Sequence, residues 1–134
     1  MEINMKEIIK DIEKKYYHFA EIIDAPKKYL HFYEIPQHDG GPHIEYEGNE
    51  LLIVYTERGN RFGEKRTKNP DEILYWFLED LTLSIASEYA RKNRRPNEDF
   101  RIKLFAKQEE LMAKISADWA NDLKMRNKKY LARK

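Results

Sequence analysis

Cysteine is absent from the 134 residues of this chain. Its absence excludes a disulfide framework, thiolate zinc sites and thiol catalysis. Long apolar runs are missing as well: none approaches the length that crosses a membrane, and residues 1–10 lack the apolar stretch of a signal peptide. We therefore expect a cytoplasmic protein with no membrane partner.

The short motifs that carry catalysis are also missing. Only five glycines are present, and none builds a phosphate-binding loop or a Gly-x-Ser-x-Gly turn. Histidines lack the His-Glu-x-x-His spacing of a metal site. These absences favour a protein that binds rather than one that transforms a substrate, with no metal and no cofactor.

Charge is abundant and unevenly distributed. Charged residues make up 37% of the chain and its formal net charge is +1. Residues 121–134 nevertheless carry six Lys or Arg against one Asp, whereas the remainder carries 19 basic and 23 acidic residues. We predict a single domain over residues 1–124 and a frayed basic tail over residues 125–134. The mildly acidic body argues against nucleic acid as the partner.

The first half of the chain reads as a helix followed by short strands. Apolar residues recur at helical spacing from Met5 to Ile23, where Ala25 and Pro26 end the pattern. Turn-forming residues separate the strands. The predicted strands are Tyr29–Ile35, His43–Tyr46, Glu50–Glu57 and Glu64–Thr67, with an irregular loop at Pro36–Pro42. The unbroken apolar run Leu51–Tyr55 predicts a strand that is covered on both sides.

Two long helices are predicted in the second half. Asn69 as N-cap and Pro70 at the first helical position begin a helix that runs to Lys92. A second helix is predicted from about Glu98 to Lys124, with Arg101 and Gln108 inside its apolar arc. These two polar residues need partners on a neighbouring loop or helix, or else they contact a ligand.

The expected fold class is therefore α+β. It comprises an N-terminal helix, a small antiparallel β-meander of three to four strands, and two long C-terminal helices packed on the sheet. Trp76 stands apart, because it lies on the side of its helix opposite to the main apolar face. It is either buried against another helix or an anchor for a partner.

Candidate contact residues gather on loops, where binding residues concentrate. They are His38, Asp39 and His43 around the irregular loop, Glu57, Arg58 and Arg61 near the following turn, and Trp76. Two alternatives remain open. Imidazole and carboxylate groups between His38 and Glu45 could serve a small metal- or histidine-dependent hydrolase, and the basic tail could serve a nucleic-acid-binding module.

The order of several short blocks between Asp39 and Trp119 resembles the immunity protein 63 family. The blocks are Asp39–Glu45, Glu57–Gly59, Thr67, Asp71–Trp76, Ile85–Tyr89, Asn93–Arg94, Asp99–Arg101, Leu104–Leu111 and Ser116–Trp119. The resemblance implies an immunity protein of a bacterial polymorphic toxin system, encoded beside the toxin that it neutralises. It also implies a cognate toxin domain as the partner and no catalytic residues. We predict that inhibition occurs by steric occlusion of the toxin's active site or substrate path.

Overall fold

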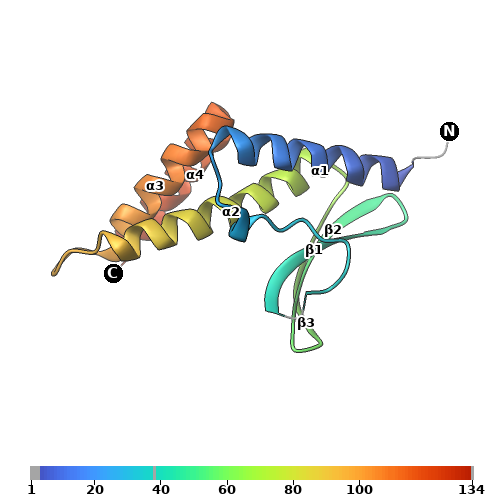
Figure 1. The fold of residues 1–134 in the computed structure, drawn as a ribbon, viewed down its shortest axis with the longest axis horizontal. Helices are drawn as coiled ribbons and strands as arrows, with labels where there is room; N and C mark the ends of the chain where they lie inside the picture. Colours follow the sequence, from blue (N-terminus) through green and yellow to red (C-terminus); the bar gives the residue numbers. More distant parts are fainter. Residues whose placement is uncertain (1–3, 38, 134) are drawn as a thin grey trace. The chain divides into compact units, whose positions relative to one another are not determined.

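The computed structural model describes residues 4–37 and 39–133 (Figure 1). Its elements along the chain are α1 (Met5–Ile22), the 3-10 helix η1 (Lys27–Tyr29), β1 (Asp39–Glu47), β2 (Glu50–Glu57), β3 (Asn60–Thr67), α2 (Pro70–Lys92), α3 (Phe100–Ile115) and α4 (Ala117–Ala132). The α+β prediction is confirmed. Within the described ranges the fold has an N-terminal helix, a three-stranded antiparallel sheet and three C-terminal helices, four α-helices in total.

The chain divides into two compact units. Unit 1 contains the described residues of Met1–His18 and Leu30–Leu78, and unit 2 contains those of Phe19–Tyr29 and Glu79–Lys134. Unit 1 therefore carries the whole sheet, and unit 2 carries α3 and α4. The single domain over residues 1–124 stays a prediction.

The sheet of unit 1 has the order β1-β2-β3, with antiparallel pairing throughout. The central strand β2 spans the predicted residues, and Leu51 to Val54 are each at most 1% exposed. Burial of four consecutive side chains confirms that both sides of β2 are covered, because neighbouring side chains of a strand point to opposite faces.

Both outer strands are longer than predicted. β1 begins at Asp39 rather than at His43, with a register shift between Asp39 and Pro42. β3 begins at Asn60 rather than at Glu64, because the turn before it has only two residues, Arg58 and Gly59. Their φ angles of +51° and +81° suit the tight turn of a two-residue hairpin.

The predicted strand Tyr29–Ile35 is wrong. No strand forms there: the 3-10 helix ends at Tyr29, and the residues that follow are irregular. The backbone N–H of His31 donates to the Tyr16 hydroxyl at 3.1 Å, and the Tyr33 carbonyl accepts from the Ile44 N–H at 2.8 Å. The backbone of this segment therefore bonds to a side chain and to one position of β1, and it forms no continuous hydrogen-bond ladder with a strand.

An aromatic cluster explains why this irregular segment is held in place. The Phe32 ring lies 5.7 Å from that of Tyr16 on α1 and 4.7 Å from that of Phe77 on α2, measured between ring centroids. All three side chains are buried. Residues 30–37 are thus anchored by an aromatic side chain packed into the core of unit 1, which is a tertiary contact rather than a strand signal.

In unit 2 the long helix predicted from Glu98 to Lys124 is two helices. Ser116 separates them in an extended conformation, with φ −157° and ψ 121°. Its backbone N–H donates to Met112 O at 2.9 Å, and its hydroxyl accepts from the Trp119 N–H at 3.2 Å. One residue therefore ends α3 and caps the start of α4.

The end of α4 is bonded to the start of α3. Arg101 donates from Nη1 to the Tyr130 carbonyl at 2.8 Å, while Asp99 accepts hydrogen bonds from the same guanidinium group. A cation at a helix C-terminus satisfies its last carbonyls and suits its dipole. Residues 125–132, which we predicted to belong to a frayed tail, are helical.

Candidate functional site

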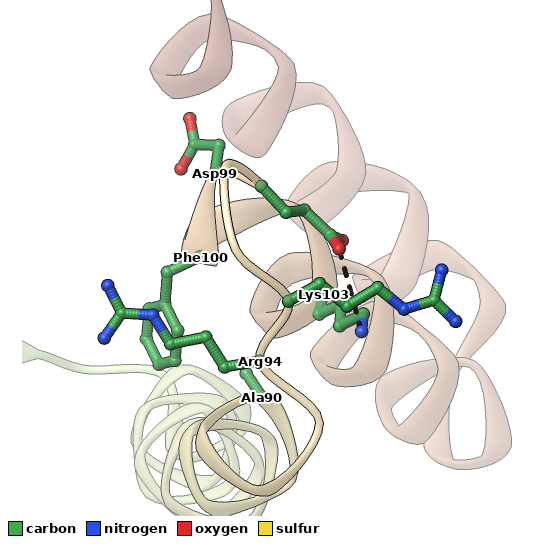
Figure 2. A pocket seen from close by; sticks show the side chains of 7 residues that line it. Ala90, Arg94, Asp99, Phe100 and Lys103 are labelled. Carbon is green, nitrogen blue, oxygen red and sulfur yellow. Dashed lines mark ion pairs between the residues drawn. The ribbon is translucent and has the colours of Figure 1, made fainter.

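The cavity in Figure 2 lies in unit 2 beside the start of α3 and has room for about one water molecule. Its lining side chains include Arg94, Phe100 and Lys103. The Lys103 ammonium already has structural partners: its Nζ donates to the Asn93 carbonyl and lies 3.7 Å from a carboxylate oxygen of Glu98. A cavity of this size offers no room for a substrate.

Within residues 4–37 and 39–133, no group of three or more His, Asp or Glu side chains is placed to hold a metal ion. Among the helices that the structure describes, none is long and apolar enough to cross a membrane.

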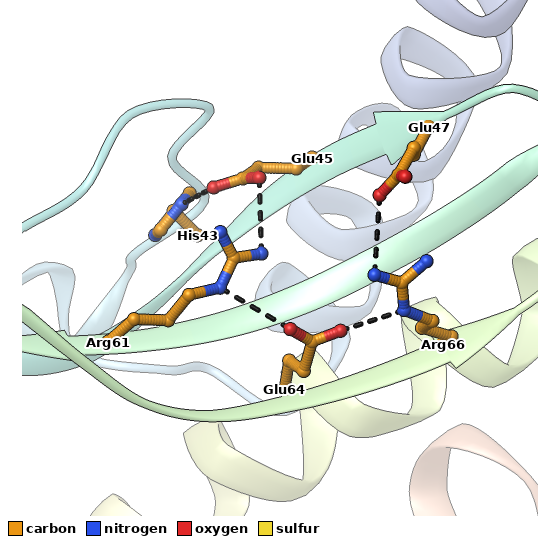
Figure 3. Close-up of polar contacts among 6 residues, drawn as sticks. All are labelled: His43, Glu45, Glu47, Arg61, Glu64 and Arg66. Atoms are coloured by element: carbon orange, nitrogen blue, oxygen red, sulfur yellow. Dashed lines mark hydrogen bonds and ion pairs between the residues drawn. The ribbon is translucent and has the colours of Figure 1, made fainter.

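One face of the sheet carries a continuous chain of ion pairs, which we call the charged sheet face (Figure 3). Its exposed or half-buried members are Glu45, Glu47, Arg61, Glu64 and Arg66, and the buried His43 completes it. Alternation places them together: His43, Glu45 and Glu47 are two residues apart on β1, as Glu64 and Arg66 are on β3.

Each charge in this chain touches the next. Glu45 Oε1 lies 3.3 Å from Arg61 Nη2, and Arg61 Nε lies 3.5 Å from Glu64 Oε1. Glu64 Oε2 accepts from Arg66 Nε at 2.8 Å, and Arg66 Nη2 lies 3.2 Å from Glu47 Oε2. Acidic and basic groups therefore alternate across the strands and hold one another in fixed positions.

His43 supports this network from beneath. Its side chain is 1% exposed, and its Nε2 lies 2.5 Å from Glu45 Oε2. The hydrogen bond from His43, followed by the charge of Arg61, lowers the pKa of Glu45 below its ordinary value. Glu45 is therefore an ionised acceptor near neutral pH, and the His43 ring faces it rather than solvent.

The ion pairs lie over apolar side chains. Val54 pairs with His43 and Glu64 in the two neighbouring strands, and Leu52 pairs with Glu45 and Arg66. Both β2 side chains are at most 1% exposed. Because long charged side chains cover apolar surface with their stems, the charged sheet face also closes the core of unit 1.

The β2–β3 turn brings another group of predicted residues together. Glu57 and Arg58 are exposed at the end of β2, and the register pairs Asp39 with Glu57. In the part of the chain that the structure describes, neither Glu57 nor Arg58 takes part in an ion pair. His38 lies outside the described residues, as does the side chain of Asp39.

Trp76 is not part of this group. It is half-buried on α2, and the Lys65 ammonium lies 5.2 Å from its ring centroid. Since Lys65 stands between Glu64 and Arg66 on β3, its side chain points to the opposite face of the sheet. The structure thus brings Glu57, Arg58 and Arg61 to one end of the sheet and leaves Trp76 on its other side.

Sequence reasoning missed Glu64, Arg66 and Glu47 as parts of a surface. The signal was present, since alternate charged positions on neighbouring strands share a face. The signal does not give the register between the strands, which decides that these side chains meet. Arg101 and Gln108 both have the structural partners expected: Arg101 bonds the end of α4, and Gln108 bonds Glu79 O at 3.2 Å.

Fold and surface together define a small α+β protein whose sheet presents fixed charges. A sequence model of the immunity protein 63 family matches residues 47–129, more than half of the chain. The chain belongs to the immunity protein 63 family. Membership implies toxin neutralisation and a cognate toxin partner, and the family is generally non-catalytic. Comparisons with curated proteins and with solved structures gave no match.

Proposed function

We propose that this protein neutralises its cognate toxin by steric occlusion, docking through the charged sheet face and the β2–β3 turn. The observation that carries the proposal is the family match over residues 47–129, which includes β2, β3 and the turn between them. Catalysis is not needed for this activity, since a bound protein excludes the toxin's substrate by occupying its site.

The ion pairs support the choice of surface. Binding orders flexible side chains at a cost, and a charge already held by its neighbours has less freedom to lose. Arg61 is held by Glu45 and Glu64, and Arg66 by Glu64 and Glu47. An array of fixed charges of both signs also selects a partner by its charge pattern.

Within this surface we assign direct contacts to Glu57, Arg58 and Arg61. Asp39 joins them because it pairs with Glu57 in the sheet register, and His38 because it precedes Asp39 in the chain. His43 is assigned a positioning role, since it is buried against Glu45. Trp76 is left outside the proposed surface.

A double charge reversal at the turn tests this proposal. We expect Glu57→Lys with Arg58→Asp to abolish protection when the chain is co-expressed with the toxin domain encoded beside it. Asp is chosen at position 58 because it tolerates the positive φ of that residue. Both residues are exposed, so the thermal midpoint should stay near that of the unchanged protein.

The matched control is Lys10→Glu with Glu21→Lys, a reversal at two exposed positions of α1 that also conserves net charge. The control should protect the cell fully. Full protection by the turn variant at equal expression would reject the proposed surface. Failure of the unchanged chain to bind or protect would reject the function itself.

A further inference from the structure

The β2–β3 hairpin carries a feature that pairing alone does not require. Tyr55 pairs with Gly63, but the next residue of β2, Thr56, pairs with Arg61. Phe62 is thus an extra residue on β3, a β-bulge placed three residues after the turn. Bulges turn a side chain away from the direction that regular alternation would give it.

The bulge exposes an aromatic ring. Phe62 is 60% exposed, the most exposed aromatic side chain in the described part of the chain. The core aromatics of unit 1, Tyr16, Phe32 and Phe77, are at most 6% exposed. An exposed phenylalanine ring contributes no hydrophobic stabilisation to the fold, whereas its burial in a partner is favourable.

Phe62 is also held in position. Its ring centroid lies 6.0 Å from that of Tyr55, a half-buried residue of the neighbouring strand, at an interplanar angle of 42°. Aromatic pairs at this separation attract each other beyond their buried area. The ring is therefore presented by a rigid strand and loses little freedom on binding, which is typical of an interface hot spot.

Two different chemistries meet at this end of the hairpin. Arg61 points toward Glu45 and Glu64 on the charged sheet face, whereas Phe62 contacts Tyr55, which alternation places on the opposite face. Arg58 lies in the turn between the strands. In Figure 1 the β2–β3 turn stands at the lower end of the sheet.

We infer that the end of the β2–β3 hairpin enters a cleft of the toxin, with Phe62 as its apolar anchor. This inference rests on the proposed function and adds the chemistry of the partner. One wall of the cleft carries an apolar pocket for Phe62, and a carboxylate faces Arg58, an exposed cation of the turn. Apolar burial supplies the affinity, and the charges orient the hairpin.

Phe62→Ala is the decisive variant, and Tyr46→Ala is its matched control. Tyr46 is a second exposed aromatic of the same sheet, 47% exposed on β1. Titration calorimetry with the purified toxin domain encoded beside this chain would measure Kd. We expect at least about 30-fold weaker binding for Phe62→Ala, the size of an ordinary hot spot, and less than about threefold for Tyr46→Ala.

The carboxylate is tested by Arg58→Gln. Its binding should be weaker, and the loss should shrink at 1 M salt because the interaction is electrostatic. Thermal unfolding of Arg58→Gln and Tyr46→Ala should match that of the unchanged protein, because both side chains are exposed. Phe62→Ala should lose only the contribution of the ring contact with Tyr55 and remain folded.

The outcomes separate the two proposals. If the unchanged chain binds and Phe62→Ala binds within threefold of it, the anchor is rejected and the proposed function stands. If Tyr46→Ala weakens binding to the toxin domain as much as Phe62→Ala does, the end of the hairpin is not the part that enters the toxin cleft. If the unchanged chain does not bind, the proposed function fails and this inference fails with it.

Discussion

Two groups of polar side chains, one in each unit of this protein, differ in burial. In unit 1, the charges of the sheet pair with one another at the surface, where Glu45, Arg61 and Arg66 are between 36% and 45% exposed. In unit 2, three hydrogen-bonded polar side chains are buried: Thr82, Gln108 and Asn127 are at most 2% exposed. Gln108 bonds Thr82, and Asn127 bonds Glu109.

This difference indicates different roles. Exposed ion pairs are screened by water and salt, so they stabilise a fold little and remain available to a partner. Buried hydrogen bonds are costly to break, because a group that loses its partner stays out of water. Polar changes in unit 2 should therefore affect stability, and polar changes on the sheet of unit 1 should affect recognition. Four predictions test this contrast.

The largest effect is expected at Gln108, a residue of α3 that bonds to Glu79 and Thr82 on α2. Gln108→Ala removes two hydrogen bonds, to Glu79 O and Thr82 Oγ1, and leaves a cavity. We expect the free energy of unfolding to fall by about 2 kcal/mol in urea titrations. Gln108→Met, which keeps the volume, should lose about half as much. A change below about 0.5 kcal/mol for the alanine variant would contradict the contrast.

A smaller loss is expected at Ser116. Ser116→Ala removes the hydroxyl that accepts from the Trp119 N–H at the start of α4. Loss of an N-cap costs about 1 kcal/mol. Ser116→Asp keeps an acceptor at the same position and serves as the control in the same urea titration. If both variants unfold alike, the hydroxyl is not what stabilises the α3–α4 junction.

Acid titration should show a smaller effect at Glu88. The Tyr29 hydroxyl, then Lys92 and Lys28, donate to this carboxylate and lower its pKa from 4.5 to about 2. A carboxylate whose pKa is lower in the folded state stabilises the fold at pH values above its pKa in the unfolded chain. This stabilisation is lost as the pH falls through its pKa in the folded state. The stability gap between the protein and Glu88→Gln should therefore be constant above pH 4.5 and close toward pH 2.

Two measurements check this prediction. The carboxyl resonance of Glu88 should titrate near pH 2 by NMR. Glu21→Gln, at an exposed position of α1, should show no such pH-dependent gap. A Glu88 titration midpoint near 4.5 would mean that the three donors do not act on the carboxylate in solution.

The smallest effect is expected on the sheet. Arg66→Gln breaks contacts with Glu47, Glu50 and Glu64 but keeps most of the stem that covers the strand. We expect the urea midpoint to stay unchanged within error in 0.15 M salt, because the arginine is exposed. A clear loss of stability here would show that the sheet charges hold the fold, as the polar groups of unit 2 do.

Elements with strong local signals were predicted to the residue. α2 begins at Pro70 because Asn69 caps it, its Oδ1 accepting from the Asp71 N–H at 3.0 Å. β2 spans Glu50–Glu57, where an apolar run lies between two turns. Both signals act over a few neighbouring residues, so no distant contact is needed to read them.

Elements without such signals were not. The segment after Tyr29 reads as a strand because it is rich in aromatic residues, yet Phe32 is buried against Tyr16 and Phe77 instead of pairing in a ladder. The apolar spacing on either side of Ser116 continues as if one helix passed through it. Nothing local distinguishes a serine that bonds the next turn from one that faces solvent.

The contact residues stay a prediction, but the structure shows which of them lie together. Glu57, Arg58 and Arg61 were chosen as loop charges, and the structure places all three at one end of the sheet. His43 was chosen as a loop histidine and is instead buried against Glu45. The bulge that exposes Phe62 has no signature in the sequence, because it depends on which residue of β2 pairs with which of β3.

By itself the sequence determined the α+β class and the bounds of α2 and β2, because caps, turn residues and apolar periodicity act between near neighbours. It also identified the family, through the order of its short blocks and the match over residues 47–129. Only the tertiary structure decided where the charges meet, which histidine is buried, and which aromatic ring faces water. Those outcomes depend on strand register and on contacts between residues far apart in the chain, and local propensity predicts neither of them.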